Sequence, residues 1–216
     1  QPIEPRLSDT ATQTLVRLLE QENNWWRITG HRMLLEKKDL SAIPVLRSLV
    51  QGDPPPTRVH ALYILDAYSA LDQKLVEIAL GDPVSGVREN ALRLAENYPE
   101  LETRVAKMTN DPSSRVALQL ALSLGEFSGQ ESSKALTTLA SRYGHDPWFQ
   151  AAILSSKIGS SPQLLQGMLS QENFFVEPNS GKEKFLEELS AIIGARSEPQ
   201  QVAQLINLLC QEQSLQ

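Results

Sequence analysis

The feature that most constrains the fold of this chain is an Asp-Pro pair that recurs at nearly regular spacing. The first three aspartates lie 29 residues apart, and the fourth follows after 35. An aspartate carboxylate accepts hydrogen bonds from the free amides of a helix's first turn, and a following proline has no amide to satisfy and a helix-ready φ. The pattern predicts four helix starts with these N-cap residues: Asp53, Asp82, Asp111 and Asp146.

A helix-period apolar run follows each pair, as in the run from Val87 to Leu92. Asn23-Asn24 opens a similar run 30 residues before Asp53. A recurrence of about 20 to 50 residues is typical of α-solenoids, in which each unit buries its apolar face only against its neighbours. We therefore expect an all-α protein of about thirteen helices, wound as a right-handed α-α superhelix in a single domain over residues 1–216.

The regular pattern is expected to cover residues 8–172, followed by a loop over 173–181 and a final helix pair over 182–211. The loop contains Phe174-Phe175-Val176, an apolar triplet that either tucks under the last helices or contacts a partner, and tucking is the favoured interpretation. Gly30 lies inside a predicted helix at some cost in stability, which indicates close approach of a neighbouring backbone.

Composition narrows the function classes. The net charge of −6, from 26 acidic and 20 basic residues, disfavours nucleic acid as a partner, because such binding needs a basic surface to displace counterions. No stretch approaches the roughly 18 consecutive apolar residues of a membrane span, so membrane insertion is not expected.

The single Cys210 excludes an intrachain disulfide and a multi-Cys metal site, and we expect it to be buried in the last helix. The start at Gln1, without a leader, suggests an excised or matured piece.

The repeated Asp-Pro-x-x-x-Val-Arg-x-x-Ala unit is fullest from Asp82 to Leu94, and it resembles the second helix of HEAT repeats in HEAT- or armadillo-like solenoids. A more specific resemblance lies in the amino-acid sequences of four segments: 24–34, 58–65, 87–96 and 146–156. Together they resemble the HEAT segment of the large secreted haem-binding proteins of planctomycetes and their relatives, which carry the label membrane-bound dehydrogenase. The resemblance covers about residues 8–160 and, more weakly, the helix pair after residue 182.

In that family a sorbosone-dehydrogenase-like β-propeller typically precedes the helical segment, and a c-type cytochrome follows it. This chain has no Cys-x-x-Cys-His motif, so we expect no cofactor in it. The resemblance implies a segment that holds redox domains in relation to one another, with those flanking domains as partners. It also implies a periplasmic or secreted setting, although the sequence leaves the cytoplasm open.

Candidate partner-binding residues fall on the predicted second helices of successive units. Trp25 and Trp26 point about 100° apart on a helix, so one is expected to pack between units and the other to lie at an edge, where it would be the best anchor for a protein. The remaining candidates are Arg27, His31, His60, Arg88 and Arg93. The row of aspartates is expected to cap helices and to pair with Arg58 or Arg88 between neighbouring units, rather than to bind metal.

The histidines give a weak indication of a metal site. His31 and His60 lie 29 residues apart at equivalent places in consecutive units, so they are expected to face the same groove. A zinc site needs further converging ligands, and neither His145 nor a nearby cysteine or carboxylate has the spacing to supply them. No Gly-x-Ser-x-Gly elbow or phosphate-binding glycine loop occurs either.

These observations favour a non-enzymatic scaffold or protein-interaction module cut from a larger secreted redox protein. Two alternatives stay open. A HEAT-like nucleic-acid-binding or DNA-repair enzyme would need a basic groove, which the net charge of −6 disfavours. A cytosolic adaptor unrelated to redox proteins would share the fold and differ in its compartment.

Overall fold

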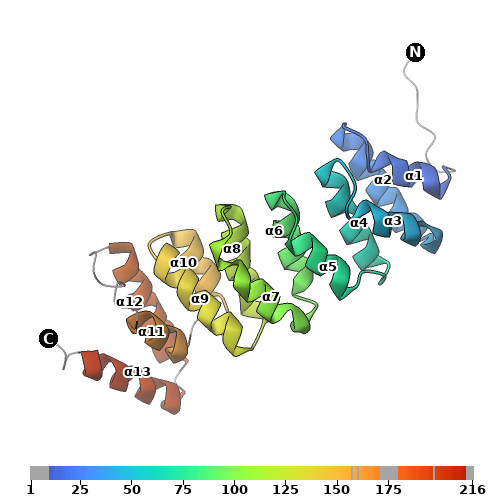
Figure 1. Cartoon of the computed structure of the whole chain (residues 1–216). Helices are drawn as coiled ribbons and strands as arrows, with labels where there is room; N and C mark the ends of the chain where they lie inside the picture. The colour runs from blue at the N-terminus through green and yellow to red at the C-terminus, as the bar shows by residue number, and fades with distance from the viewer. Residues whose placement is uncertain (1–9, 157, 160, 171–179, 197, 213–216) are drawn as a thin grey trace. The chain divides into compact units, whose positions relative to one another are not determined.

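The computed structural model describes residues 10–156, 158–159, 161–170, 180–196 and 198–212. In these ranges the protein is all-helical, with thirteen α-helices, four short 3₁₀ helices and no strand (Figure 1). The first six α-helices are α1 (Thr12–Leu18), α2 (Asn24–Lys37), α3 (Ile43–Leu49), α4 (Pro55–Ala67), α5 (Gln73–Leu80) and α6 (Ser85–Ala95). The next seven are α7 (Glu102–Ala106), α8 (Ser114–Ser123), α9 (Gln130–Tyr143), α10 (Pro147–Leu154), α11 (Pro162–Leu169), α12 (Ser180–Ala195) and α13 (Pro199–Glu212). The 3₁₀ helices are η1 (Leu40–Ala42), η2 (Pro99–Leu101), η3 (Lys107–Asn110) and η4 (Leu124–Glu126).

The chain divides into two compact units, Gln1–Ala91 and Leu92–Gln216. Within the first unit α1 packs against α2 and α3 against α4, and α2 also packs against α4. As the all-round apolar sequence of α4 predicts, this helix lies between neighbours, and Leu62, Ile64 and Leu65 are fully buried.

The contact between α1 and α2 depends on Gly30. A Cβ atom at this position would lie 2.8 Å from Leu18 Cβ and 2.9 Å from the Leu15 carbonyl oxygen. The predicted close backbone approach is therefore confirmed. It also explains why a residue that weakens a helix interior by about 1 kcal/mol is present there.

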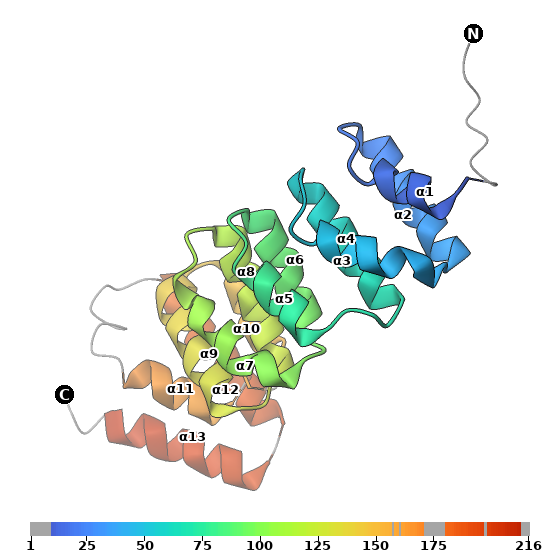
Figure 2. The same ribbon diagram turned by 45° about the vertical axis from the view of Figure 1, so that its right-hand side comes forward.

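The second unit has two rows of helices (Figure 2). In one row α9 packs between α7 and α11, and in the other α10 packs between α8 and α12. The rows meet where α9 contacts α10, and α13 packs on α11 and α12. Leu120, Leu136, Leu139 and Ile153 are fully buried in this unit. Each short helix thus buries its apolar side against helices from neighbouring pairs.

The four aspartates do not share one role at the helix starts. Asp146 is the N-cap of α10, where its carboxylate accepts from the Trp148 amide at 2.8 Å. The carboxylates of Asp82 and Asp111 instead accept amides two residues on, at Val84 and Ser113, before the helix begins. At these two places the carboxylate closes a side-chain turn over the proline and the helix begins only at Ser85 or Ser114, so the N-cap position falls on a later residue. The N-cap prediction is therefore wrong for these two residues.

The N-cap prediction is also wrong for Asp53. The N-cap of α4 is Pro54, no side chain in the described part of the protein caps this helix, and the Asp53 carboxylate binds Arg58 instead. Three consecutive prolines move the helix start to Pro55, which leaves Asp53 too far back to reach the first-turn amides. The N-terminus of α9 is capped from a distant helix, since Glu102 of α7 accepts from the Ser132 amide at 3.0 Å.

Two predictions near the C-terminal end need correction. Ser180 and Gly181 belong to α12 and not to the predicted loop. Phe174, Phe175 and Val176 lie outside the described residues. Cys210 is exposed and not buried, and it lies on α13, the last helix along the chain, which packs on α11 and α12. Within the described ranges no helix has both the length and the apolar character needed to cross a membrane.

Candidate functional site

The structure places most of the predicted partner-binding residues in the first unit. Trp25, Trp26, Arg27 and His31 lie on α2, His60 lies on α4 and Arg88 on α6. Arg93 is also on α6, but it belongs to the second unit. Its Nε atom donates to Gln119 Oε1 at 2.8 Å. The sequence-based set therefore divides between the two units.

The fourth residue of four helices has one shared structural role. In each case its side chain reaches back and donates to a backbone carbonyl six residues earlier, in or before the turn that leads into the helix. The donor–acceptor pairs are Arg27 to Gln21 at 2.7 Å, Arg58 to Gly52 at 2.7 Å, Arg88 to Asp82 at 2.8 Å and Gln150 to Gly144 at 2.8 Å. These bonds, which we call the fourth-residue ties, satisfy carbonyls that a helix start would otherwise leave without a partner. The fourth residue of α8 is Ala117, which cannot make such a bond.

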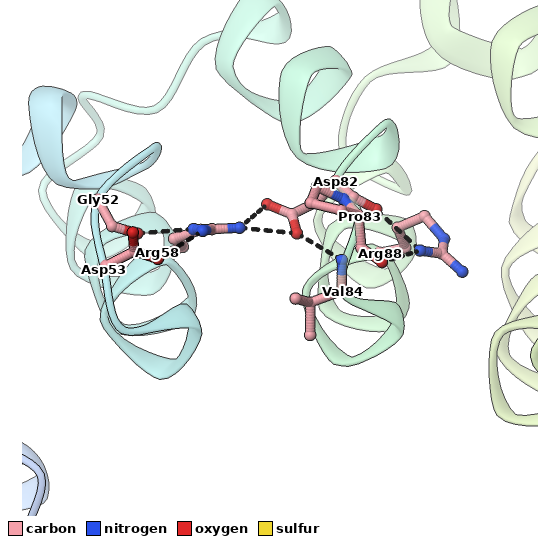
Figure 3. A network of polar contacts seen from close by, with 7 residues as sticks. All are labelled: Gly52, Asp53, Arg58, Asp82, Pro83, Val84 and Arg88. Atoms are coloured by element: carbon pink, nitrogen blue, oxygen red, sulfur yellow. Dashed lines mark hydrogen bonds and ion pairs between the residues drawn. The ribbon is translucent and has the colours of Figure 1, made fainter.

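Arg58 extends its tie into a bridge between two helix pairs (Figure 3). Its Nη1 atom contacts both carboxylate oxygens of Asp82, at 2.9 and 2.8 Å, and its Nη2 atom contacts Asp53 Oδ1 at 2.8 Å. The side chains of Arg58 and Asp82 are only 12% and 8% exposed, whereas that of Asp53 is 84% exposed. The hydrogen bond to Asp82, followed by the contact with Asp53, raises the pKa of Arg58. The predicted pairing of an aspartate with Arg58 between neighbouring units is confirmed for Asp82.

The ties give Arg27 and Arg88 a structural role that the sequence did not reveal. Arg27 also donates to the Glu22 carbonyl at 2.6 Å, and Arg88 to the Pro83 carbonyl at 3.1 Å. A guanidinium group held by backbone oxygens has fewer donors left for a partner. The binding of a partner by these arginines stays a prediction.

His31 and His60 meet, as their spacing predicts. The two Nδ1 atoms lie 3.1 Å apart, and the ring centroids are 5.0 Å apart with a tilt of 59°. Both residues are half-buried. Burial lowers the pKa of His31, and burial together with the nearby His31 and Arg27 lowers the pKa of His60 to about 4. Both imidazoles are therefore neutral at pH 7.

His60 also lines a shallow apolar groove of about 300 Å³ in the first unit. The groove lies between the N-terminal halves of α4 and α6, and its walls are mostly proline and valine: Pro55, Pro56, Val59, His60, Val84, Gly86, Val87 and Asn90. Behind His60, the Tyr63 hydroxyl donates to Asn90 Oδ1 at 3.0 Å, which joins the two helices. The groove is therefore a preformed apolar surface with polar groups at its edge.

The two adjacent tryptophans of α2 differ in exposure, as predicted. Trp25 is 54% exposed and Trp26 is half-buried, and their rings meet edge to face with centroids 4.7 Å apart. Ile28, one turn further along α2, is 53% exposed. Trp25 and Ile28 thus form a second apolar surface in the first unit. Trp148 of the second unit is 75% exposed.

The second unit contains a polar chain that the sequence analysis missed. Gln119 Nε2 donates to Ser123 Oγ at 3.0 Å, and Ser123 Oγ donates to Glu96 Oε1 at 2.6 Å. Gln119 and Ser123 are buried, and Arg93 completes the chain through Gln119 Oε1. The one available signal was a glutamine inside an otherwise apolar run.

The second unit also has a larger hollow of about 810 Å³. Its lining is mainly serine and glutamine, with one arginine and one glutamate: Ser128, Gly129, Gln130, Ser133, Ile158, Ser161, Gln163, Arg196, Glu198 and Gln201. This set contains no nucleophile–base pair of the Ser-His or Cys-His kind. Among the described residues, no three His, Cys, Asp or Glu side chains converge as metal ligands.

No protein-family model matches this chain, and no curated protein is significantly similar to it.

Proposed function

We propose that this chain is a non-enzymatic protein-interaction or scaffold module, built as a HEAT-like, right-handed α-α superhelix. The two rows of helices in the second unit and the recurring fourth-residue ties support a repeated helix pair. Repeat proteins of this kind expose an extended surface on their second helices, which suits protein partners better than small molecules.

The observation that carries the proposal is the apolar groove between α4 and α6. Its walls come from two helix pairs that the Arg58 bridge holds together through Asp82, so the groove exists before any partner binds. A preformed site loses less conformational entropy on binding than one that must be assembled. Proline and valine side chains at Pro55, Pro56 and Val59 supply apolar area, and His60 and Asn90 supply polar contacts.

Photo-crosslinking tests the groove directly. A benzophenone amino acid at Val59 or Val84 in the full-length gene product is expected to crosslink to a flanking domain or a second protein. The same group at Glu77, an exposed residue of α5 that does not line the groove, serves as control. Equal crosslinking from Val59 and Glu77, or none from the groove positions, would argue against a docking role.

The superhelix has a separate test in solution scattering. A compact domain of this length has a radius of gyration of about 17 Å, whereas a stack of helix pairs is more elongated. A measured radius well above that value supports the superhelix, and a value near it contradicts it.

We further propose that the module belongs to a larger secreted redox protein and lies between a dehydrogenase-like propeller and a c-type cytochrome. The proposal is supported by the resemblance of segments 24–34, 58–65, 87–96 and 146–156 to that family. The DNA sequence on either side of this coding region tests the proposal. If the proposal is right, the same reading frame also encodes a Cys-x-x-Cys-His motif and an export signal. A frame without either would leave a cytosolic adaptor.

A further inference from the structure

The contact between His31 and His60 joins two helices through a single shared proton. At an Nδ1–Nδ1 distance of 3.1 Å one imidazole donates and the other accepts, so the two rings have opposite tautomers. His31 lies on α2 and His60 on α4, and these helices pack directly against each other. The hydrogen bond therefore lies at the joint between the first two helix pairs.

The protonation states of the pair differ in what they do to this joint. A first added proton leaves the bond in place, because an imidazolium can still donate Nδ1–H to a neutral imidazole. A second proton removes the last acceptor lone pair and places two like charges at the same 3.1 Å contact. Attraction then becomes repulsion, and the partial burial of the two rings weakens the screening of this repulsion by water.

The charged surroundings add to this repulsion. Within the described residues, the charge that acts on His60 besides its partner is Arg27, and no carboxylate counteracts it. On α4 itself Arg58 is neutralised by its carboxylates, and on α3 Arg47 is paired with Asp72. The neighbouring helix α6 presents the neutral side chain of Asn90.

Other charged groups of the α1 region and of α2 have positions or partners of their own. Arg17 and Glu20 of the α1 region line a separate hollow with Val45, and Arg32 pairs with Glu36 on α2 at 3.4 Å. A metal ion is disfavoured because Arg27 lies close by and no third ligand converges among the described residues. The proton is thus the cation that this pair can take up.

We propose that the His31–His60 pair is an acid-sensitive latch that releases α2 from α4 when both imidazoles are protonated. The proposal concerns the stability of the first unit, and it does not depend on whether the groove binds a protein. Because His60 lines the groove, opening the latch also changes the groove wall.

The direction of the pH effect follows from the neutral folded state. Burial lowers the pKa values of both histidines, that of His60 to about 4. Between about pH 6.5, the ordinary histidine pKa, and about pH 4 the unfolded chain therefore binds more protons than the folded chain. The latch contributes its full stability above about pH 6.5 and loses it as the pH falls towards 4. Allowing for partial solvent screening, the equilibrium constant for opening is expected to rise about tenfold from about pH 7 to about pH 5.

Tryptophan fluorescence of the full chain tests the latch, with Trp148 replaced by phenylalanine so that the signal comes from Trp25 and Trp26 of α2. The parent chain is expected to lose urea resistance between about pH 6.5 and about pH 4.5. H60Q should flatten this dependence, because glutamine cannot titrate. H145Q removes an exposed histidine outside the pair and should leave the dependence unchanged.

Imidazole titration by NMR keeps the test decisive if H60Q fails to fold. In the parent chain the pKa of His60 must lie well below 6.5, and H31Q should raise it. Titration of His60 near 6.5 in the parent chain would overturn the proposal, as would equal pH dependence in the parent chain and H60Q.

Discussion

Replacement of Arg58 by methionine is expected to destabilise the first unit by about 3 kcal/mol. The change removes the guanidinium group from Asp82, whose side chain is 8% exposed and, among the described residues, would keep only the hydrogen bond from the Val84 amide. Breaking a buried ion pair from one side costs about 3–5 kcal/mol, because the remaining charge has no partner. Methionine retains much of the apolar stem that arginine packs against its neighbours, so the lower end of this range applies.

The contact between Arg58 and Asp53 contributes much less. The Asp53 side chain is 84% exposed, and an exposed ion pair contributes about 0.2–1 kcal/mol. D53N is therefore expected to cost well under 1 kcal/mol. R58K keeps the charge but cannot bond Gly52, Asp53 and Asp82 together, so it should fall between R58M and D53N.

Urea unfolding followed by circular dichroism measures these differences, and hydrogen exchange of the α4 and α6 amides locates them. R32M is the matched control, because Arg32 is 69% exposed and its ion pair within the described part of the chain is with Glu36 on its own helix. Its expected cost is within about 0.5 kcal/mol of zero. If R58M is no more destabilising than R32M, or if D53N costs as much as R58M, the bridge through Asp82 does not hold the two helix pairs together.

Three further predictions concern single positions. G30A should destabilise by about 1–3 kcal/mol in thermal or urea unfolding, since its Cβ would meet a neighbour at 2.8 Å. G86A should be neutral or stabilising by up to about 1 kcal/mol, because no atom of the described residues lies within 4 Å of the added Cβ. D146A should cost about 1 kcal/mol in the same assay through loss of the α10 cap, and an unchanged midpoint would contradict that role. The hydrogen bond from Arg47 lowers the pKa of Asp72, so this carboxylate stabilises the fold above about pH 4 and loses that effect as the pH falls through its folded value. D72N should therefore lower the melting temperature near neutral pH and weaken its dependence on acid, and parallel melting curves for D72N and the parent chain across this range would refute the assignment.

Helix positions followed from local signals, which is why most of them could be predicted. The pattern around Asp72 and Gly81 predicts a helix ending at Leu80, and α5 spans Gln73–Leu80. The apolar run after Asp111 predicts one helix from about Pro112 to Phe127, whereas α8 spans Ser114–Ser123 and continues as the 3₁₀ turn η4. Tightening of a last turn depends on what packs against it, and a single sequence carries no such information. The two compact units leave the single domain over residues 1–216 a prediction.

Contacts in the candidate site could be predicted only where the spacing of residues along the sequence determined which side chains meet. His31 and His60 occupy equivalent places in consecutive units, so a constant period brought them to one joint. The partner of a carboxylate is different, because it depends on distances across the fold. Asp53 binds Arg58 instead of capping α4, whereas Asp146 caps α10, and the Asp-Pro pair that they share does not by itself distinguish the two roles. A glutamine in an apolar run was the one signal at Gln119, and it did not identify the partners, which come from two helices.

The fourth-residue ties have a consequence for how such a chain can change over time. Each tie spans six residues, so it lies wholly within one helix and the corner that leads into it. Duplication or loss of an entire helix pair would carry the fastening with it and leave the adjacent corners as they were. Insertion of one residue between Gly52 and Arg58 would instead move the carbonyl beyond the reach of a side chain of fixed length. The chain can thus grow or shrink by whole modules more readily than by single residues.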